Sequence, residues 1–186
     1  MEFKIKAKLI TSEDLRRIIT RLAHEIIEKN RGIEDLVVIG LRTRGAFLAE
    51  RIASKIEEIE KSKIPTGYLD VTLYRDDFRT RFKQPEVQVT NIPFQIDEKN
   101  IILVDDVFYT GRTVRAALDA LMDFGRPARI HLAVLVDRGH REFPLKADFV
   151  GKNIPTSIGE EVRVKMTEVD EEDCVYLVEQ VEEGGK

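Results

Sequence analysis

The sequence lacks the features that mark several protein classes. Its 186 residues contain a single cysteine, Cys174, which excludes an internal disulfide and a cysteine-rich zinc site. No apolar run is long enough to cross a membrane, and the first residues alternate charged and apolar side chains where a signal peptide would have an apolar core. The Walker motif Gly-x-x-x-x-Gly-Lys-Ser/Thr is absent. We therefore expect a cytoplasmic protein without membrane contact, in which any phosphate site is of another kind.

The charge is distributed unevenly along the chain. The formal net charge is −4, but residues 168–186 alone carry −7, from eight acids and one lysine, so the remainder carries +3. A net negative charge argues against indiscriminate binding of nucleic acid. The uneven distribution nevertheless allows a basic face on the rest of the molecule.

Apolar periodicity predicts an α/β fold in one domain that spans residues 1–186. Stripes with helical spacing alternate with short apolar runs typical of strands, and this order favours a doubly wound, mostly parallel sheet. Thr11 or Ser12 can cap the first helix, and Gly32 is a natural end for it. The expected helices cover residues 13–31, 46–59 and 114–122, and the expected strands cover residues 36–39, 68–74, 101–104, 130–136, 162–166 and 175–178.

The most informative segment is residues 101–113. Four apolar residues predict a buried strand, Asp105 and Asp106 follow it, and the turn Thr110-Gly111-Arg112-Thr113 opens a helix. Ligands of open α/β sheets bind beyond the carboxyl ends of the strands, and a helix N-terminus favours a phosphate. Two adjacent acids at the end of an apolar strand serve no packing purpose. The segment therefore predicts a site for a ligand with hydroxyls and a phosphate, such as a phosphorylated sugar.

A second turn, residues 40–45, also follows an expected strand. Glycines bracket it, and Arg42 and Arg44 lie between them. Backbone N–H groups and guanidinium donors in such a turn can bind a pyrophosphate. A turn of this composition is often only a turn, but together with the acidic pair it indicates a second anion site.

Residues 101–113 resemble the signature of type I phosphoribosyltransferases, which bind 5-phosphoribosyl pyrophosphate (PRPP). The resemblance implies the doubly wound sheet of that family, a small hood and a flexible lid loop. The hood is expected to comprise roughly residues 137–186 together with the N-terminal residues. It implies that the acids hold the ribose hydroxyls, partly through Mg²⁺, that the turn holds the 5-phosphate and that the loop at residues 40–45 holds pyrophosphate. The implied ligands of PRPP or nucleotide are Thr43, Arg44, Asp105, Asp106, Val107, Tyr109, Thr110, Gly111, Arg112 and Thr113.

The charged loop that begins near residue 75 lies where this family has its lid. Closing such a lid would exclude water from a reactive sugar cation. Arg75, directly after the expected strand, is the best candidate to neutralise the departing pyrophosphate, and we add it to Asp105 and Asp106 as a catalytic residue. Arg79 and Arg81 are better explained as solvated surface residues.

Three longer segments, residues 70–77, 101–113 and 135–157, together resemble the PyrR family. Its members regulate pyrimidine operons by binding leader mRNA when a uridine nucleotide (UMP or UTP) is bound, and they convert uracil and PRPP to UMP and pyrophosphate. Tyr109 agrees with this, since purine-using relatives have an acid at the matching position. Asp137 and Ile158 match the base site. The alternative is a purine salvage enzyme of the same fold without RNA binding. We also expect a homodimer or a larger homo-oligomer.

Two groups of residues match the RNA face of the PyrR family. The first group lies on one side of the first expected helix, and the second is spread over the segment after residue 137. Arginine and histidine can pair with phosphates or stack on unstacked RNA bases, although a polar helix face is more often simply solvated. The resemblance leads us to expect an arginine at Lys146, and lysine lacks its bidentate contact. The predicted RNA contacts are Thr20, Arg21, His24, His140, Arg141, Lys146 and Lys152.

Overall fold

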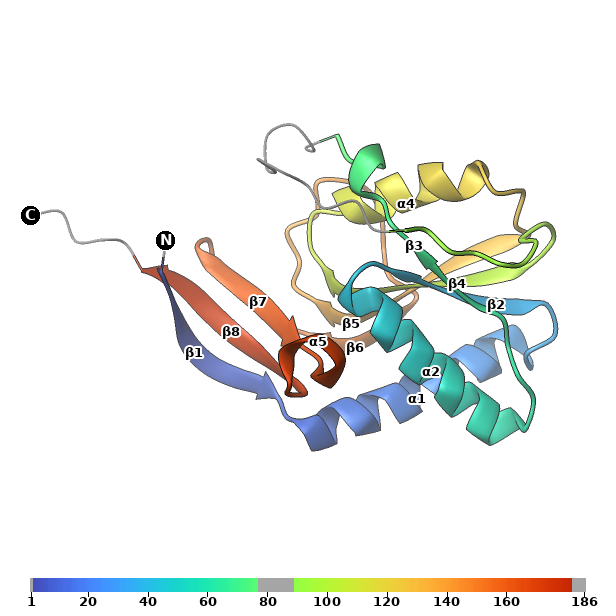
Figure 1. Cartoon of the computed structure of the whole chain (residues 1–186). Coiled ribbons are helices and arrows are strands. Elements are labelled where there is room, and N and C mark those ends of the chain that lie inside the picture. The colour runs from blue at the N-terminus through green and yellow to red at the C-terminus, as the bar shows by residue number, and fades with distance from the viewer. Residues whose placement is uncertain (1, 77–88, 182–186) are drawn as a thin grey trace, which may run out of the picture.

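The computed structural model describes residues 2–76 and 89–181 and contains a five-stranded, fully parallel central sheet (Figure 1). Helices α1 and α2 cover one face of this sheet, and α4 covers the other. The predicted doubly wound α/β fold is thereby confirmed. In spatial order the strands are β3 (Thr66–Leu69), β2 (Leu36–Leu41), β4 (Asn100–Phe108), β5 (Arg129–Asp137) and β6 (Phe149–Asn153). The three helices that cover the sheet are α1 (Ser12–Asn30), α2 (Arg44–Glu60) and α4 (Arg112–Met122).

Strand β4 shows why these residues form a central strand. Ile101 and Leu103 pack in the apolar cluster on the α4 side, whereas Ile102 and Val104 belong to the cluster on the side of α1 and α2. All four side chains are fully buried. A parallel strand with helices on both faces needs such a continuous apolar run, because side chains alternate between the two faces.

A second, antiparallel sheet forms the hood, which we define as β1 (Glu2–Ile10), β7 (Glu160–Lys165), α5 (Thr167–Asp170) and β8 (Cys174–Val181). Its strand order is β1-β8-β7, so the first and last strands of the described chain are paired (Figure 1). Buried Val162, Val164 and Val175 join the same apolar cluster as α1 and α2. The hood therefore continues the hydrophobic core on one side of the central sheet.

The expected helices are confirmed, with small differences at their ends. Thr11 is the N-cap of α1 and forms a reciprocal capping box with Asp14. The left-handed residue at the end of α1 is Arg31, one position before Gly32. Among the described residues, no helix has the length and apolar character needed to cross a membrane.

The strand expected at residues 68–74 is wrong in both its bounds. Strand β3 covers Thr66–Leu69, and residues Thr72–Tyr74 form a 3₁₀ turn. The cause is local: the Asp70 carboxylate accepts a hydrogen bond from the Thr72 backbone N–H at 2.9 Å, which bends the chain out of the sheet. Strands β1 and β6 were not predicted, and β4 extends beyond residue 104 to Phe108.

Candidate functional site

The two acids of β4 lie at the carboxyl edge of the central sheet and line different cavities. Asp105 lines a small cavity of about 90 Å³ beside the N-terminus of α4. Asp106 lines a large cavity of about 550 Å³ between this edge and the hood. Consecutive residues of a strand point to opposite faces, which explains the division. The pair therefore stands between two cavities that one extended ligand could fill together.

The small cavity has the donors that an anion requires. Gly111 has a φ of +93° in the turn before α4, a conformation that favours glycine. The Arg75 guanidinium donates to Thr113 Oγ1 at 2.8 Å, and both residues line the cavity with Thr110. Hydroxyls, a guanidinium and the N-terminus of an eleven-residue helix thus converge on one space. This arrangement suits a phosphate group.

Asp105 is electrostatically unusual. Only 8% of its surface is exposed, and this burial, together with the neighbouring Asp106 carboxylate, raises the pKa of Asp105 well above its ordinary value. The Arg75 guanidinium opposes the shift in part. The Asp106 backbone N–H donates to Asp105 Oδ1 at 3.0 Å, which holds the carboxyl in place. A positive charge that develops beside the pair would relieve the repulsion between the acids, as in many catalytic sites.

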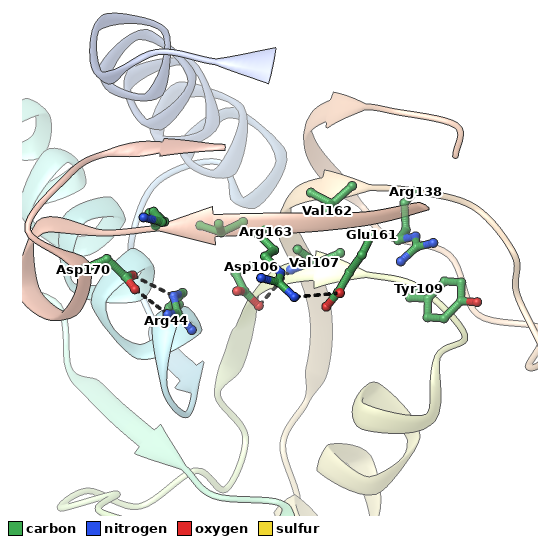
Figure 2. A pocket seen from close by; sticks show the side chains of 11 residues that line it. Arg44, Asp106, Val107, Tyr109, Arg138, Glu161, Val162, Arg163 and Asp170 are labelled. Atoms are coloured by element: carbon green, nitrogen blue, oxygen red, sulfur yellow. Dashed lines mark hydrogen bonds and ion pairs between the residues drawn. The ribbon is translucent and has the colours of Figure 1, made fainter. Parts of the chain in front are cut away.

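The loop at residues 40–45 approaches β4 closely, as the two predicted anion sites require. A Cβ atom on Gly45 would lie 2.8 Å from the Val104 carbonyl oxygen, so only glycine permits this approach. Thr43 precedes α2 and is half-buried. Arg44 lines the large cavity with Asp106, but its guanidinium donates to both oxygens of Asp170 in the hood, at 2.9 and 2.7 Å (Figure 2).

Tyr109 and Arg138 line the opposite end of the large cavity and belong to a stack of three side chains. The Arg138 guanidinium lies 4.0 Å from the centre of the Tyr109 ring, which meets the His140 ring edge to face at 5.8 Å. Arg138 is 7% exposed and donates to Thr156 Oγ1 at 3.0 Å and to the Glu160 carbonyl at 2.6 Å. It thereby joins Tyr109 on the core side to the hood (Figure 2).

Sequence reasoning did not identify Arg138 as a site residue. A usable signal was present, because an arginine directly after a buried strand that ends at the ligand-binding edge rarely lies there for packing. A further cavity of about 840 Å³ lies beyond this stack and includes Ile158 in its wall. The Ile158 side chain is 99% exposed, so no other part of the described chain covers it.

Asp137 and Arg141 are engaged with each other. The Asp137 carboxylate accepts from the Arg141 guanidinium and from the Gly139 backbone N–H, the latter at 3.0 Å. Arg141 also donates to the Tyr109 carbonyl and lies over the Phe108 ring, 3.3 Å from its centre. The structure thus directs Arg141, a predicted RNA contact, toward the residues around the acidic pair.

The other predicted RNA contacts are divided between exposed and engaged side chains. Arg21 and His24 are exposed on α1, and the Arg21 guanidinium donates to the Gly151 carbonyl of β6 at 2.5 Å. Exposed Lys152 follows directly in β6, so the fold brings one residue of the second predicted group beside Arg21 of the first. Thr20 is half-buried, and its hydroxyl donates a hydrogen bond to the Arg16 carbonyl. The His140 ring lies within 2.7 Å of the Thr156 carbonyl, and Lys146 is exposed.

The predicted lid residues Arg79 and Arg81 lie outside the described residues. Arg112, at the start of α4, forms ion pairs with Asp76, at the stem of that loop, and with Glu142. The last described residues before the loop are therefore tied to the turn that forms the small cavity.

The acidic pair fits Mg²⁺ that arrives with a substrate. In the described part of the chain, no three histidine, cysteine or acidic side chains are grouped to form a complete metal site. Mg²⁺ commonly keeps several waters and uses one or two carboxylates with the phosphates of its substrate. Asp105 and Asp106, each beside an open cavity, supply such a partial set of ligands.

This geometry has counterparts in known proteins. Residues 9–169 match the family described as "Phosphoribosyl transferase domain". Three bacterial proteins with the name "Bifunctional protein PyrR" are similar over nearly the whole chain. The protein of Pelotomaculum thermopropionicum is 56% identical over 177 residues, covering 95% of this chain and 98% of that protein. Those of Thermus aquaticus (58% over 176 residues, 95% and 97% covered) and Deinococcus radiodurans (58% over 172 residues, 92% and 94% covered) are equally similar.

Solved structures of hypoxanthine phosphoribosyltransferases share the fold. The Staphylococcus aureus structure has a TM-score of 0.67 at 20% identity, with 92% of each chain covered. The Trypanosoma cruzi structure has a TM-score of 0.71 at 18% identity, with 94% of this chain and 97% of the other covered. At such low identity this likeness concerns the fold alone.

Proposed function

The chain belongs to the phosphoribosyl transferase domain family and, within it, to the PyrR group, and from this premise we propose that it is a uracil phosphoribosyltransferase that also regulates a pyrimidine operon. The observation that carries the enzymatic part is the position of Asp105 and Asp106 between an anion cradle and a hooded cavity. Its substrates are uracil and PRPP, and its products are UMP and pyrophosphate.

Each part of PRPP has a place in this arrangement. The 5-phosphate enters the small cavity, where Thr110, Gly111, Arg112 and Thr113 offer hydroxyl and backbone donors. The ribose hydroxyls face the acidic pair and the neighbouring Val107. Pyrophosphate extends into the large cavity toward Thr43 and Arg44. Mg²⁺, held by Asp105 and Asp106 through water and substrate, supplies charge neutralisation for the pyrophosphate when bound.

The reaction is a displacement at the anomeric carbon. The bond from this carbon to the pyrophosphate oxygen breaks, the new bond to uracil N1 forms, and the N1 proton leaves to water or to pyrophosphate. Positive charge develops on the sugar, where the acidic pair stabilises it. Arg75, predicted from the sequence to neutralise the departing pyrophosphate, instead lines the small cavity with Asp105 and donates to Thr113, so we assign it to the phosphate end. The protein contributes position and electrostatic stabilisation, and no side chain forms a covalent intermediate.

Uracil is the base that the end of the cavity favours. Tyr109 offers an aromatic face beside Arg138, in place of the acid of purine-using relatives. Asp137 and Ile158 complete the base site, with Arg141 fixing the orientation of Asp137. Pyrimidine sites need such a combination of apolar surface and a few placed polar groups.

The regulatory part of the proposal rests on the basic surface where α1 meets β6. Arg21, His24 and Lys152 are exposed there, and Thr20 and Lys146 complete the set. His140 and Arg141, which complete the predicted RNA contacts, both touch Tyr109 of the nucleotide site, so UMP or UTP in the cavity can alter their positions. The RNA partner is the leader mRNA of the operon.

We further propose that residues 1–186 act as one domain, with the lid and the hood closing over the substrates. The hood expected from roughly residues 137–186 and the N-terminal residues is narrower in the structure, because β6 belongs to the central sheet. The protein works in the cytoplasm, where its substrates and nascent RNA are found, and it forms a homodimer or a larger homo-oligomer.

The enzymatic proposal is tested by mixing the protein with Mg²⁺, PRPP and uracil and by measuring UMP. We expect turnover that needs Mg²⁺ and disappears in the Asp105→Asn/Asp106→Asn double variant. Parallel reactions with guanine and hypoxanthine identify the base. Turnover with a purine alone would support the purine salvage alternative, and full activity of the double variant would refute the assigned site.

The regulatory proposal is tested by measuring the Kd for the leader RNA at several salt concentrations, with and without UMP. We expect UMP to tighten binding, and Arg21→Ala to weaken it about 10-fold with a smaller salt slope, because one phosphate contact is lost. Arg126→Ala is the matched control, since it removes an exposed arginine from the turn between α4 and β5, which contains none of the predicted RNA contacts. Equal effects of both variants, or indifference to UMP, would contradict the proposal.

A further inference from the structure

Acidic residues of the hood form ion pairs with two arginines of α2. The Arg44 guanidinium donates to both oxygens of Asp170. About two turns further along α2, Arg51 donates to both oxygens of Glu168, at 2.9 and 2.7 Å. Arg51 also pairs with Asp173, at 2.8 Å. The two ion pairs of α5 therefore have the same bidentate geometry, but only one of them reaches the ligand cavity.

The Arg44–Asp170 pair lies in that cavity together with Asp106 (Figure 2). The Arg44 side chain is 35% exposed and that of Asp170 16%, so water can enter and the pair can open. The hydrogen bonds from Arg44 lower the pKa of Asp170, which is therefore ionised at neutral pH. The proposed pyrophosphate site thus already contains an anion.

A carboxylate and a phosphate present the same kind of oxygen pair to a guanidinium, and both bind it in the bidentate mode. Asp170 occupies the Nε and one terminal donor of Arg44, an edge of the guanidinium that also fits a pyrophosphate oxygen pair. Both anions cannot hold this edge of the guanidinium at once. Binding of pyrophosphate at this edge of Arg44 therefore requires displacement of Asp170.

We propose that Asp170 is a positioning residue that substitutes for pyrophosphate on Arg44, orients this guanidinium in the free enzyme, and competes with PRPP and pyrophosphate for it. This inference rests on the proposed function, in which Arg44 binds pyrophosphate. The competition weakens the affinity for both ligands and accelerates product release, since the carboxylate recaptures Arg44 as pyrophosphate leaves.

Asp170 also has a structural contact, which determines the choice of variant. Its Oδ2 accepts a hydrogen bond from the Met166 backbone N–H at 3.0 Å and so closes the turn of α5. An asparagine at this position keeps a carbonyl oxygen for Met166 and loses the charge that holds Arg44. Asp170→Asn is therefore the sharpest substitution, and Glu168→Gln is its matched control on the same short helix.

The test measures the KM for PRPP, the inhibition constant of magnesium pyrophosphate and kcat for the wild type and the two variants. For Asp170→Asn we expect both PRPP KM and the inhibition constant to fall about three- to tenfold, the range for a half-buried charge pair, with uracil KM unchanged. Glu168→Gln should leave all of these values within about twofold. Unchanged or raised values in Asp170→Asn would overturn the inference, since a raised KM would mean that Asp170 assists binding.

Two further measurements separate this inference from the proposed function. Arg44→Gln should raise the KM for PRPP; if it does not, the assignment of Arg44 to pyrophosphate fails. If it does while Asp170→Asn has no effect, only the role of Asp170 fails. A crystal structure of the wild type with magnesium pyrophosphate tests the inference without depending on the folding of any variant. In it, the Arg44 guanidinium should bind the ligand instead of Asp170. An intact Arg44–Asp170 pair beside bound pyrophosphate would overturn the inference.

Discussion

The two walls of the large cavity are built in different ways. The core wall is formed by the carboxyl end of β4 and the loop that follows. It is one continuous segment of the chain, in which neighbouring residues line the cavities. The hood wall is held by pairs distant in sequence, such as Arg44–Asp170 and Arg138–Glu160. The core wall is anchored by fully buried apolar residues below it, whereas several hood contacts are polar and partly exposed.

This difference indicates a division of labour. Electrostatic catalysis needs groups that do not reorganise during the reaction, and a buried central strand provides that rigidity. Substrate entry and product release need contacts that can open, and half-exposed ion pairs cost little to break. The following predictions test whether chemistry and stability are divided between the walls in this way.

The largest effect is expected for Asp105→Asn on the core wall. Loss of a charge beside the developing cation should lower kcat at least about 100-fold. Because the pKa of Asp105 is raised in the folded protein, its ionisation destabilises the fold at pH values above the ordinary Asp range. The variant should therefore be more stable than the wild type at about pH 7, and the difference should shrink toward about pH 4.

Urea unfolding at these two pH values, with steady-state kinetics, checks this prediction. A variant that is inactive and also less stable at neutral pH would contradict the assignment of Asp105 as a strained catalytic acid. Asp106→Asn is the matched comparison, since Asp106 is more exposed than Asp105.

The next effect concerns Arg138, which joins the walls. Arg138→Met should cost about 2 kcal/mol of stability, because it leaves the Glu160 carbonyl without its guanidinium donor. It should also raise the KM for uracil about 10-fold, since the stack on Tyr109 is lost. Thermal unfolding and uracil titration measure both values. Arg129→Met, at the exposed far end of the same strand, should change neither, and equal effects of the two variants would remove the special role of Arg138.

A smaller effect is expected for Asp173 in the hood. Hydrogen bonds from Arg51 lower the pKa of Asp173 to about 2, so its contribution to stability is present above the ordinary Asp pKa and is lost as pH falls toward about 2. Asp173→Asn should cost about 1 kcal/mol at about pH 7 and almost nothing at about pH 2. Unfolding at both pH values checks this. Glu13→Gln, in an exposed pair with Arg17, should cost less than about 0.5 kcal/mol at either pH.

The smallest effect is expected for Tyr109→Phe. The contacts of Tyr109 with Arg138 and His140 are made by the ring, which phenylalanine retains. The KM for uracil should stay within about twofold, whereas Tyr109→Leu, which loses the same stack as Arg138→Met, should raise it about 10-fold. If Tyr109→Phe were as harmful as Tyr109→Leu, the hydroxyl would be the functional group, and the assignment of this residue as a stacking surface would be wrong.

The sequence-based predictions succeeded where the signal was local. The apolar run before Asp105, the turn with Gly111 and the cap at Thr11 depend on residues within a few positions of one another, and each was confirmed as structure. The error at residues 68–74 arose because alternation resembled a strand while Asp70 formed a turn. Strand β1 was missed because its pairing with β8 joins opposite ends of the chain.

The sequence by itself determined the α/β fold, the acidic pair, the turn that opens α4 and the resemblance to the PyrR family, because spacing along a strand, a turn or a helix is encoded by neighbouring residues. Only the tertiary structure decided that Asp105 and Asp106 line different cavities, that Arg138 joins the walls, that Arg141 faces Asp137, and that Asp170 holds Arg44. The physical reason is that burial and ion pairing depend on which distant segments meet, and the order of residues along the chain does not state this.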